Sequence, residues 1–122
     1  MLEVLLIDDN PMQLRVREAV LRDAGFSVAT ATTAEEALSQ LRELGAGTRF
    51  SVIVTDHVMP GDSGSVFVRQ LRELHSHIPV LVVTGLPEAE EEYEGLNVSF
   101  LQKPCPPEKL IDRVRKLSGQ PS

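Results

Sequence analysis

The sequence predicts an α/β fold in which a doubly wound sheet of five parallel strands carries helices on both faces. Short apolar runs alternate with helical segments five times along the 122 residues, and this pattern is typical of parallel strands joined by right-handed crossovers. Polar residues also follow four of the runs at their carboxyl ends. In such a sheet those ends share one edge, and ligands bind there.

The first strand is expected at residues 3–8. Asn10 is a favourable N-cap and Pro11 suits the first position of a helix, so a helix is predicted to begin here. Gly25 is expected to end this helix. We expect its core face to consist of four apolar residues, Met12, Val16, Ala19 and Val20.

The next strand, helix and strand also have clear boundaries. Residues 26–31 read as a strand, and Thr33 with Glu36 forms a capping box that starts the second helix. A glycine-rich break ends that helix. The apolar residues 50–55 then form a buried strand that leads into Asp56.

The remaining elements continue the alternation. A turn at 61–64 precedes a third helix, strands are expected at 79–84 and 98–101, and a last helix begins after Pro106. The core faces are expected to contain Val66, Phe67, Leu71 and Leu74 in the third helix, and Leu110, Ile111, Val114 and Leu117 in the last.

Composition indicates one globular domain without a nucleic-acid or membrane contact. Hydrophobic residues make up 42% of the chain, and the formal net charge of −6 argues against a basic nucleic-acid-binding face. No apolar run approaches the roughly 20 residues of a membrane span. The single Cys105 and the lack of a signal-peptide pattern favour the cytoplasm. We expect one domain over residues 1–117 and a flexible tail or linker over 118–122.

The residues that follow the strands point to a site for a metal ion and a phosphoryl group. Three carboxylates, Asp8, Asp9 and Asp56, are expected at one edge of the sheet. At a spacing of about 5 Å each pair repels by roughly 3 kcal/mol. Mg²⁺ relieves such repulsion and shares its ligand shell with phosphate oxygens. Lys103 and the Thr84 hydroxyl suit phosphate oxygens, and Asp56 can accept a phosphoryl group as an acyl phosphate.

With these residues in this order, the chain resembles the receiver domains of bacterial two-component response regulators, which belong to a chemotaxis-regulator-like superfamily. The resemblance covers residues 2–117 and implies a flavodoxin-like sheet with strand order 2-1-3-4-5. It rests on residues that each follow a strand: Asp8-Asp9, Asp56-His57-Val58-Met59-Pro60 with Gly64, Thr84, and Lys103-Pro104.

The resemblance implies a role for each acid of the site. Asp56 would be the phosphoacceptor and would also contact the metal ion. Asp9 would be a direct Mg²⁺ ligand, whereas Asp8 would act mostly through metal-bound water. The backbone carbonyl of Val58 would be a further protein ligand.

The resemblance also implies a switch and a partner. Lys103 would hold the phosphoryl group and precede a cis peptide bond to Pro104. Thr84 would move toward the phosphate while Phe100 turns inward behind it. The phosphoryl donor would be a phosphohistidine on a sensor histidine kinase or a histidine phosphotransfer domain. An output partner or effector domain is implied, but nothing specifies it.

Two departures from the family pattern bear on output. Val58 cannot position an attacking water, so the dephosphorylation rate is left open. The stretch between Thr84 and Lys103 is shorter than the family usually has, and its apolar residues are few: Ala89, Tyr93 and Leu96. We therefore expect a fourth helix that is short, displaced or partly disordered. Output would then use a different face or depend on ordering of the acidic segment 88–97.

Two other functions stay open at this point. A phosphatase of the haloacid-dehalogenase type also combines Asp, Mg²⁺, Thr and Lys, but it needs an Asp where Val58 stands and its acidic pair comes late in the chain. The second alternative is a receiver-like binding module that is no longer phosphorylated, and the complete set of site residues argues against it. We expect no enzyme beyond a domain that catalyses its own phosphoryl transfer and dephosphorylation. His57 is expected to be a bystander.

Overall fold

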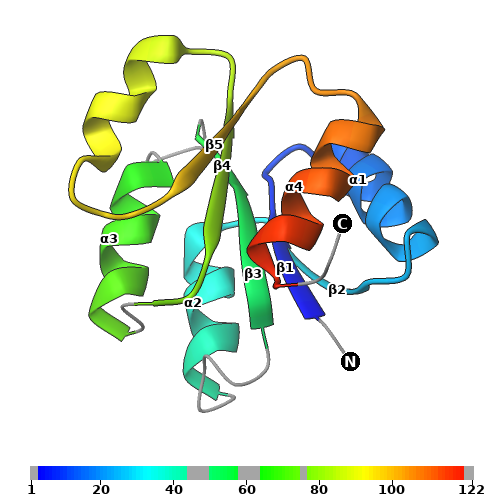
Figure 1. Cartoon of the computed structure of the whole chain (residues 1–122). Helices are drawn as coiled ribbons and strands as arrows, with labels where there is room; N and C mark the ends of the chain where they lie inside the picture. The colour runs from blue at the N-terminus through cyan, green and yellow to red at the C-terminus, as the bar shows by residue number, and fades with distance from the viewer. Residues whose placement is uncertain (1–2, 44–49, 58–63, 75–76, 120–122) are drawn as a thin grey trace.

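The computed structural model describes residues 3–43, 50–57, 64–74 and 77–119 of the chain. A five-stranded parallel sheet with the order β2-β1-β3-β4-β5 forms its centre (Figure 1). Its strands are β1 (Glu3–Ile7), β2 (Ser27–Ala31), β3 (Phe50–Asp56), β4 (Val80–Thr84) and β5 (Ser99–Gln102). The expected sheet and strand order are confirmed, and each strand boundary lies within about two residues of its predicted place.

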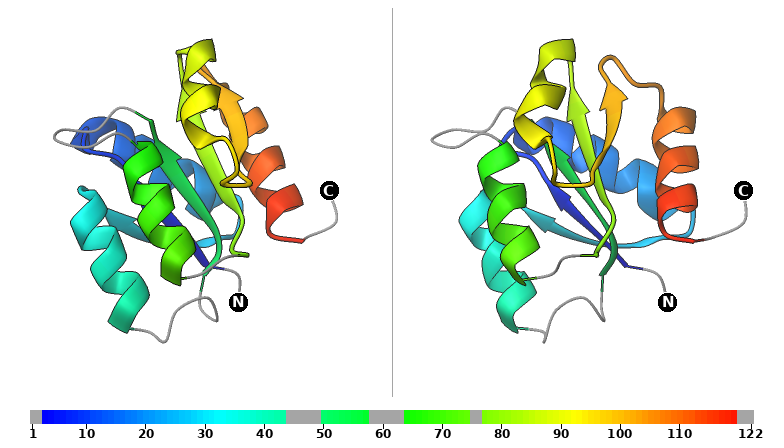
Figure 2. Two further views of the ribbon diagram at one scale, coloured as in Figure 1. Left: turned by 90° about the vertical axis from the view of Figure 1, so that its left-hand side faces the viewer. Right: turned by 60° about the vertical axis from the view of Figure 1, so that its left-hand side comes forward.

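Helices cover both faces of this sheet, as expected for a doubly wound fold. Figure 2 shows α1 (Pro11–Asp23) and α4 (Pro107–Leu117) on one face, with α2 (Ala34–Glu43) and α3 (Gly64–Leu74) on the other. Asn10 caps α1, because its side-chain oxygen accepts the Met12 N–H at 3.0 Å and the Gln13 N–H at 3.1 Å. None of the helices in the described ranges is both long and apolar enough for a bilayer crossing.

The segment between β4 and β5 forms only a seven-residue 3₁₀ helix, η1 (Pro87–Tyr93). The prediction of a short or irregular fourth helix is therefore confirmed. Four of the seven residues of η1 are acidic, and among its side chains whose burial is described only Ala89 and Tyr93 are deeply buried. This face is too small to hold a longer amphipathic helix against the sheet. In Figure 1, η1 (yellow) lies beyond the sheet on the side of α3.

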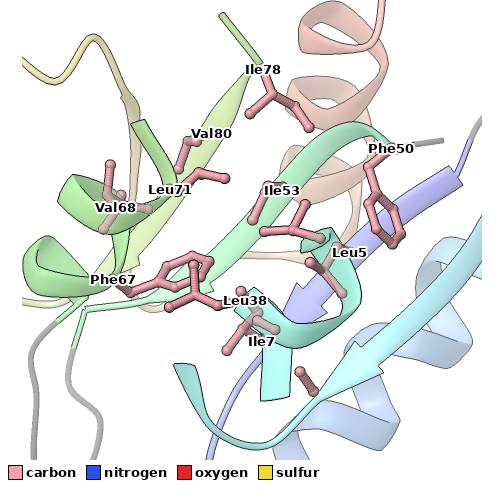
Figure 3. Close-up of a cluster of buried hydrophobic side chains, with 14 of the residues drawn as sticks. Leu5, Ile7, Leu38, Phe50, Ile53, Phe67, Val68, Leu71, Ile78 and Val80 are labelled. Atoms are coloured by element: carbon pink, nitrogen blue, oxygen red, sulfur yellow. The ribbon is translucent and has the colours of Figure 1, made fainter. Parts of the chain in front are cut away.

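The core consists of two apolar layers, one on each face of the sheet. Val4 and Leu6 of β1 point into the layer under α1 and α4, whereas Leu5 and Ile7 point into the layer under α2 and α3. Figure 3 shows the second layer, in which Phe67 of α3 meets residues of β1, β3 and α2. Full burial of such a side chain contributes about 1.5–3 kcal/mol, so these layers fix which face each helix presents to the sheet.

The predicted core face of α1 is largely wrong, because Val20 alone of its four residues packs against the core. Met12 is 76% exposed and Val16 is 57% exposed, and Ala19 is exposed as well, whereas Val20 is half-buried. The buried residues are Leu14, Arg17 and Leu21. Two leucines bury more apolar area than the smaller Val and Ala side chains, and they turn the helix so that Arg17 also faces inward.

The predicted core face of α3 is half right. Phe67 and Leu71 are buried as expected, and Val68 is buried with them. Val66 and Leu74 are 38% and 40% exposed, because the bulky Phe67 sets the orientation of the helix. In α4 the expected Leu110 and Val114 are buried, while Ile111 and Leu117 are half-buried.

Candidate functional site

The acid pocket, as we call the cluster of charged side chains at the carboxyl edge of the sheet, is built around Asp56, the last residue of β3. Asp56 is buried, and its Oδ2 accepts a hydrogen bond from Nζ of Lys103 at 2.8 Å. The Lys103 N–H donates to the carbonyl of Thr84 at 2.9 Å, so the pairing of β4 with β5 extends up to the lysine. The peptide bond from Lys103 to Pro104 is cis. The sheet therefore brings a carboxylate and an ammonium group from distant parts of the chain into contact.

A second acid shares this pocket. Asp8 follows β1, the neighbour of β3 in the sheet, and it is fully buried. Its Oδ1 accepts the Asn10 N–H at 3.0 Å and its Oδ2 accepts Nη1 of Arg17 at 3.0 Å. Burial is the main cause that raises the pKa of Asp8. The charge of Asp56 raises it as well, whereas the Asn10 hydrogen bond and the charges of Arg17 and Lys103 act to lower it.

Arg17 is the pocket residue that sequence reasoning missed. Its Nη1, besides holding Asp8, lies 3.8 Å from Oδ2 of Asp56. One guanidinium thus stands between the two buried acids. A signal existed, because Leu14, Arg17 and Leu21 follow the spacing of a helical core stripe. An arginine at such a position needs an acidic partner in the core.

The other expected site residues surround this cluster. Asp9 is exposed. Thr84, at the end of β4, is buried, and its hydroxyl oxygen accepts the Leu86 N–H at 3.0 Å. Phe100 is half-buried, and its ring meets that of Tyr93 edge to face at a centroid distance of 5.4 Å. The expected carbonyl ligand, from Val58, lies outside the described residues.

His57 links the pocket to η1. The side chain is buried, and its Nδ1 lies 2.8 Å from the hydroxyl oxygen of Tyr93, with which it shares a hydrogen bond. Its Nε2 lies 3.4 Å from Oε2 of Glu92. Burial, together with the charges of Glu92 and Asp56, raises the pKa of Tyr93, so the phenol keeps its proton at neutral pH. Sequence reasoning did not foresee these contacts, which tie the residue after Asp56 to another element.

The start of α3 packs tightly against this link. Gly64 N–H donates to the carbonyl of His57 at 2.7 Å. A Cβ on Gly64 would come within 2.5 Å of the Tyr93 hydroxyl oxygen and 2.8 Å of the Asp56 carbonyl oxygen. Only glycine allows this approach of helix, strand and tyrosine.

Comparison with known proteins agrees with this geometry. The family model of the response regulator receiver domain matches residues 4–115. The chain belongs to this family. Receiver domains of this family occur in two-component response regulators, where their general role is phosphorylation-dependent signalling.

The receiver domain is similar to parts of larger transcriptional regulators. It is 37% identical over 117 residues to the C4-dicarboxylate transport transcriptional regulatory protein DctD of Pseudomonas aeruginosa, and the match covers 93% of this chain and 24% of that protein. It is 34% identical over 119 residues to the hydrogenase transcriptional regulatory protein HoxA of Cupriavidus necator, with 93% and 23% covered. The chain therefore spans about a quarter of the length of these curated relatives.

Solved structures share the fold of this receiver domain. The chemotaxis protein CheY4 of Vibrio cholerae superposes with a TM-score of 0.85 at 31% identity, over 96% of this chain and 98% of that one. The receiver domain of the hybrid histidine kinase CckA gives a TM-score of 0.80 at 30% identity, over 95% and 98%. These neighbours confirm the flavodoxin-like architecture.

The carboxylates of this receiver domain are suitable ligands for Mg²⁺, although Asp8 and Asp56 already accept hydrogen bonds from Arg17 and Lys103. In the described part of the chain, Oδ1 of Asp56 is the one buried side-chain polar atom without a hydrogen-bond partner. A hard cation prefers such a carboxylate oxygen. Asp8 is held by Arg17, however, and within the described ranges no three His, Cys, Asp or Glu side chains are grouped to hold a metal ion. Asp56 thus has an oxygen that could hold the ion, whereas Oδ2 of Asp8 is engaged by Arg17.

Proposed function

We propose that this domain is a phosphorylation-dependent signalling switch whose phosphoacceptor is Asp56. The observation that supports it best is the state of the Asp56 carboxylate. It is buried, one of its oxygens is held by Lys103 at 2.8 Å, and the other has no partner among the described residues. An oriented carboxylate with one free oxygen beside a fixed positive charge is suited to accept a phosphoryl group.

The reaction transfers a phosphoryl group from a histidine nitrogen to a carboxylate oxygen of Asp56. An oxygen of Asp56 forms a bond to phosphorus as the P–N bond of a phosphohistidine breaks, and the released imidazole takes a proton from solvent. The donor is a sensor histidine kinase or a histidine phosphotransfer domain. Lys103 stabilises the negative charge on the phosphoryl oxygens because its ammonium is already in place.

The ion that supports this transfer is Mg²⁺. Asp8, Asp9, Asp56 and the backbone carbonyl of Val58 would hold it, with Asp8 acting mostly through water. When bound, the ion neutralises charge on the phosphoryl oxygens. Every other contribution comes from the chain: β3 and β1 place the acids, and the register of β5 places Lys103.

The kinase or phosphotransfer partner docks beside the pocket on α1. A cavity of about 530 Å³ between α1 and α4 is lined by residues that include Val16, Val20, Cys105 and Leu110, together with the pocket cations Arg17 and Lys103. Val16 and the neighbouring Met12 are exposed. An apolar surface that ends at the two residues touching Asp56 suits a partner that must bring its phosphohistidine to that acid.

Two contacts would transmit the phosphorylation of Asp56 to the rest of the domain. Thr84 and Phe100 form the switch that the family resemblance implies, and Phe100 touches Tyr93. The hydrogen bond between His57 and Tyr93 adds a second connection from the phosphoacceptor to η1. Because η1 is short and acidic, we propose that output depends on how this segment is held against α3.

The wider organisation is proposed by analogy with the relatives. The receiver unit comprises residues 1–117, and 118–122 form a tail or the start of a linker. The output is an effector domain or a separate partner protein, as the names of the transcriptional regulators suggest, and the domain itself makes no nucleic-acid or membrane contact. Its setting is the cytoplasm.

Intact mass spectrometry after incubation with acetyl phosphate and Mg²⁺ tests this function. The wild type and the control Asp112→Asn, which changes an exposed acid on α4, should each gain one phosphoryl group. Asp56→Asn should gain none. Modification of Asp56→Asn, or an unmodified wild type, would contradict the proposal. Steady release of phosphate from a generic phosphate ester would favour the phosphatase alternative instead.

A further inference from the structure

Arg17 is a buried cation inside the acid pocket, and the switch described above does not account for it. Its side chain is 7% exposed and projects from the inner face of α1, between Leu14 and Leu21. Ordinary core packing would favour an apolar residue there, because a buried charge costs several kcal/mol in desolvation unless it is paired. Arg17 is paired, at 3.0 Å to Oδ2 of Asp8 and 3.8 Å to Oδ2 of Asp56.

Among the described residues, the buried charges of the pocket already balance without a metal ion. Two buried carboxylates, Asp8 and Asp56, face two cations, Arg17 and Lys103. The mutual repulsion that would draw a divalent cation into the pocket is therefore largely offset. A Mg²⁺ ion entering beside Arg17 would also meet repulsion from the guanidinium.

The hydrogen bonds lead to the same conclusion. Both oxygens of Asp8 are engaged, one by the Asn10 N–H and the other by Arg17. Within the described ranges, the buried carboxylate oxygen without a partner is Oδ1 of Asp56. Because the guanidinium lies between Oδ2 of Asp8 and Oδ2 of Asp56, an ion, or the water that it carries, competes with it for Oδ2 of Asp8.

We propose that Arg17 is a positioning residue that acts as an internal counter-cation and competes with Mg²⁺ for Asp8. The inference rests on the proposed function, in which Mg²⁺ supports phosphorylation of Asp56. In the metal-free domain Arg17 holds Asp8 and screens Asp56. When Mg²⁺ binds, the guanidinium is displaced from Asp8, and this competition weakens metal binding. The position of the Arg17 side chain of α1 therefore changes with metal binding.

Titration calorimetry with MgCl₂ tests the competition. Arg17→Gln removes the buried charge, and Arg15→Gln removes an exposed charge of the same helix as a matched control for net charge. Relative to Arg15→Gln, Arg17→Gln should bind Mg²⁺ at least about tenfold more tightly, because a unit charge at this distance acts with little screening. Arg17→Lys, which keeps the charge, should stay close to wild type. A smaller gain in Arg17→Gln overturns the proposal.

A second measurement needs no variant and so does not depend on how Arg17→Gln folds. In the wild type, the side-chain NMR signals of Arg17 should shift with added Mg²⁺ at the same midpoint as the Asp8 amide, and its guanidinium protons should exchange faster. Unchanged signals at saturation overturn the proposal. Mass spectrometry separates this proposal from the proposed function. If Asp56 is phosphorylated but Arg17→Gln and Arg15→Gln bind Mg²⁺ equally, only the competition between Arg17 and Mg²⁺ is disproved. If the two variants differ in Mg²⁺ affinity but Asp56 is not phosphorylated, only the phosphorylation switch is disproved.

Discussion

The hydrogen bond between Tyr93 and His57 makes the strongest prediction about how the phosphoacceptor is connected to the rest of the domain. Tyr93→Phe removes only the hydroxyl group. It keeps the ring that meets Phe100 at 5.4 Å and His57 at 5.6 Å between centroids. The variant therefore isolates the contact of 2.8 Å to Nδ1 of His57.

The expected cost follows from burial. Tyr93 is 3% exposed and His57 is 5% exposed, so no bulk water replaces the lost hydroxyl at the imidazole nitrogen. A typical hydrogen bond contributes about 1 kcal/mol net, and a buried partner left without one costs about 1–3 kcal/mol. We expect Tyr93→Phe to lower the free energy of unfolding by about 1–3 kcal/mol.

Urea denaturation of the wild type, Tyr93→Phe, His57→Phe and the double variant gives this energy as a double-mutant cycle. The coupling between the two side chains should be about 1 kcal/mol in the unphosphorylated domain. A coupling within roughly 0.5 kcal/mol of zero would refute the reasoning, because independent sites add to that precision. The proposed route to η1 also requires the coupling to change when the domain carries beryllofluoride with Mg²⁺.

Three further perturbations test the pocket and its supports. Lys103→Met keeps the aliphatic stem but removes the ammonium 2.8 Å from Asp56, so phosphoryl incorporation from acetyl phosphate should slow by about tenfold or more; an unchanged time course would contradict this role. Burial raises the pKa of Asp8 above its ordinary 3.8. Between 3.8 and the raised pKa, the folded state binds more protons than the unfolded state, so the free energy of unfolding falls as pH rises. Without Mg²⁺, the stability of Asp8→Asn relative to wild type should therefore increase as pH rises through that window, and denaturation curves with a flat difference would argue against it. Gly64→Ala should lose about 1–3 kcal/mol, because its Cβ would meet backbone and a packed hydroxyl. The control Gly85→Ala, whose Cβ would have only an ordinary contact at 3.8 Å, should stay within about 0.5 kcal/mol in the same denaturation experiment.

The sheet could be predicted from sequence because its signals are local. The strands β1, β3 and β4 are short apolar runs closed by polar residues, and a buried parallel strand needs little else. The reason that Asp8, Asp56 and Lys103 could be expected at one place is topological. In a parallel sheet the residues after the strands share an edge whatever their separation along the chain.

Helix faces were harder to predict because several apolar stripes compete. In α1, Met12 and Val16 are apolar and suitably spaced, yet both are exposed. The orientation follows instead from packing of Leu14 and Leu21 and from the ion pair of Arg17, which a hydrophobic pattern counts as a polar residue. A core stripe that contains a charged residue therefore resembles a solvent-facing stripe in the sequence.

The two unforeseen contacts of the site come from tertiary placement. Tyr93 lies 36 positions from His57 and within an acidic run, so no spacing rule relates them. Arg17 meets Asp8 across a helix and a strand end. In both cases the helix that carries the side chain fixes its position. The partner residue can be identified only from the tertiary structure.

The central claim is that Asp56 itself carries the phosphoryl group, and its chemical identity can be tested directly. Treatment of the acetyl phosphate product with borohydride reduces an acyl phosphate of aspartate to homoserine, and peptide mass spectrometry then locates the change. We predict homoserine at position 56 and unmodified aspartate at positions 8 and 9. Homoserine at Asp8 or Asp9, or at no acid of the pocket, would contradict the account.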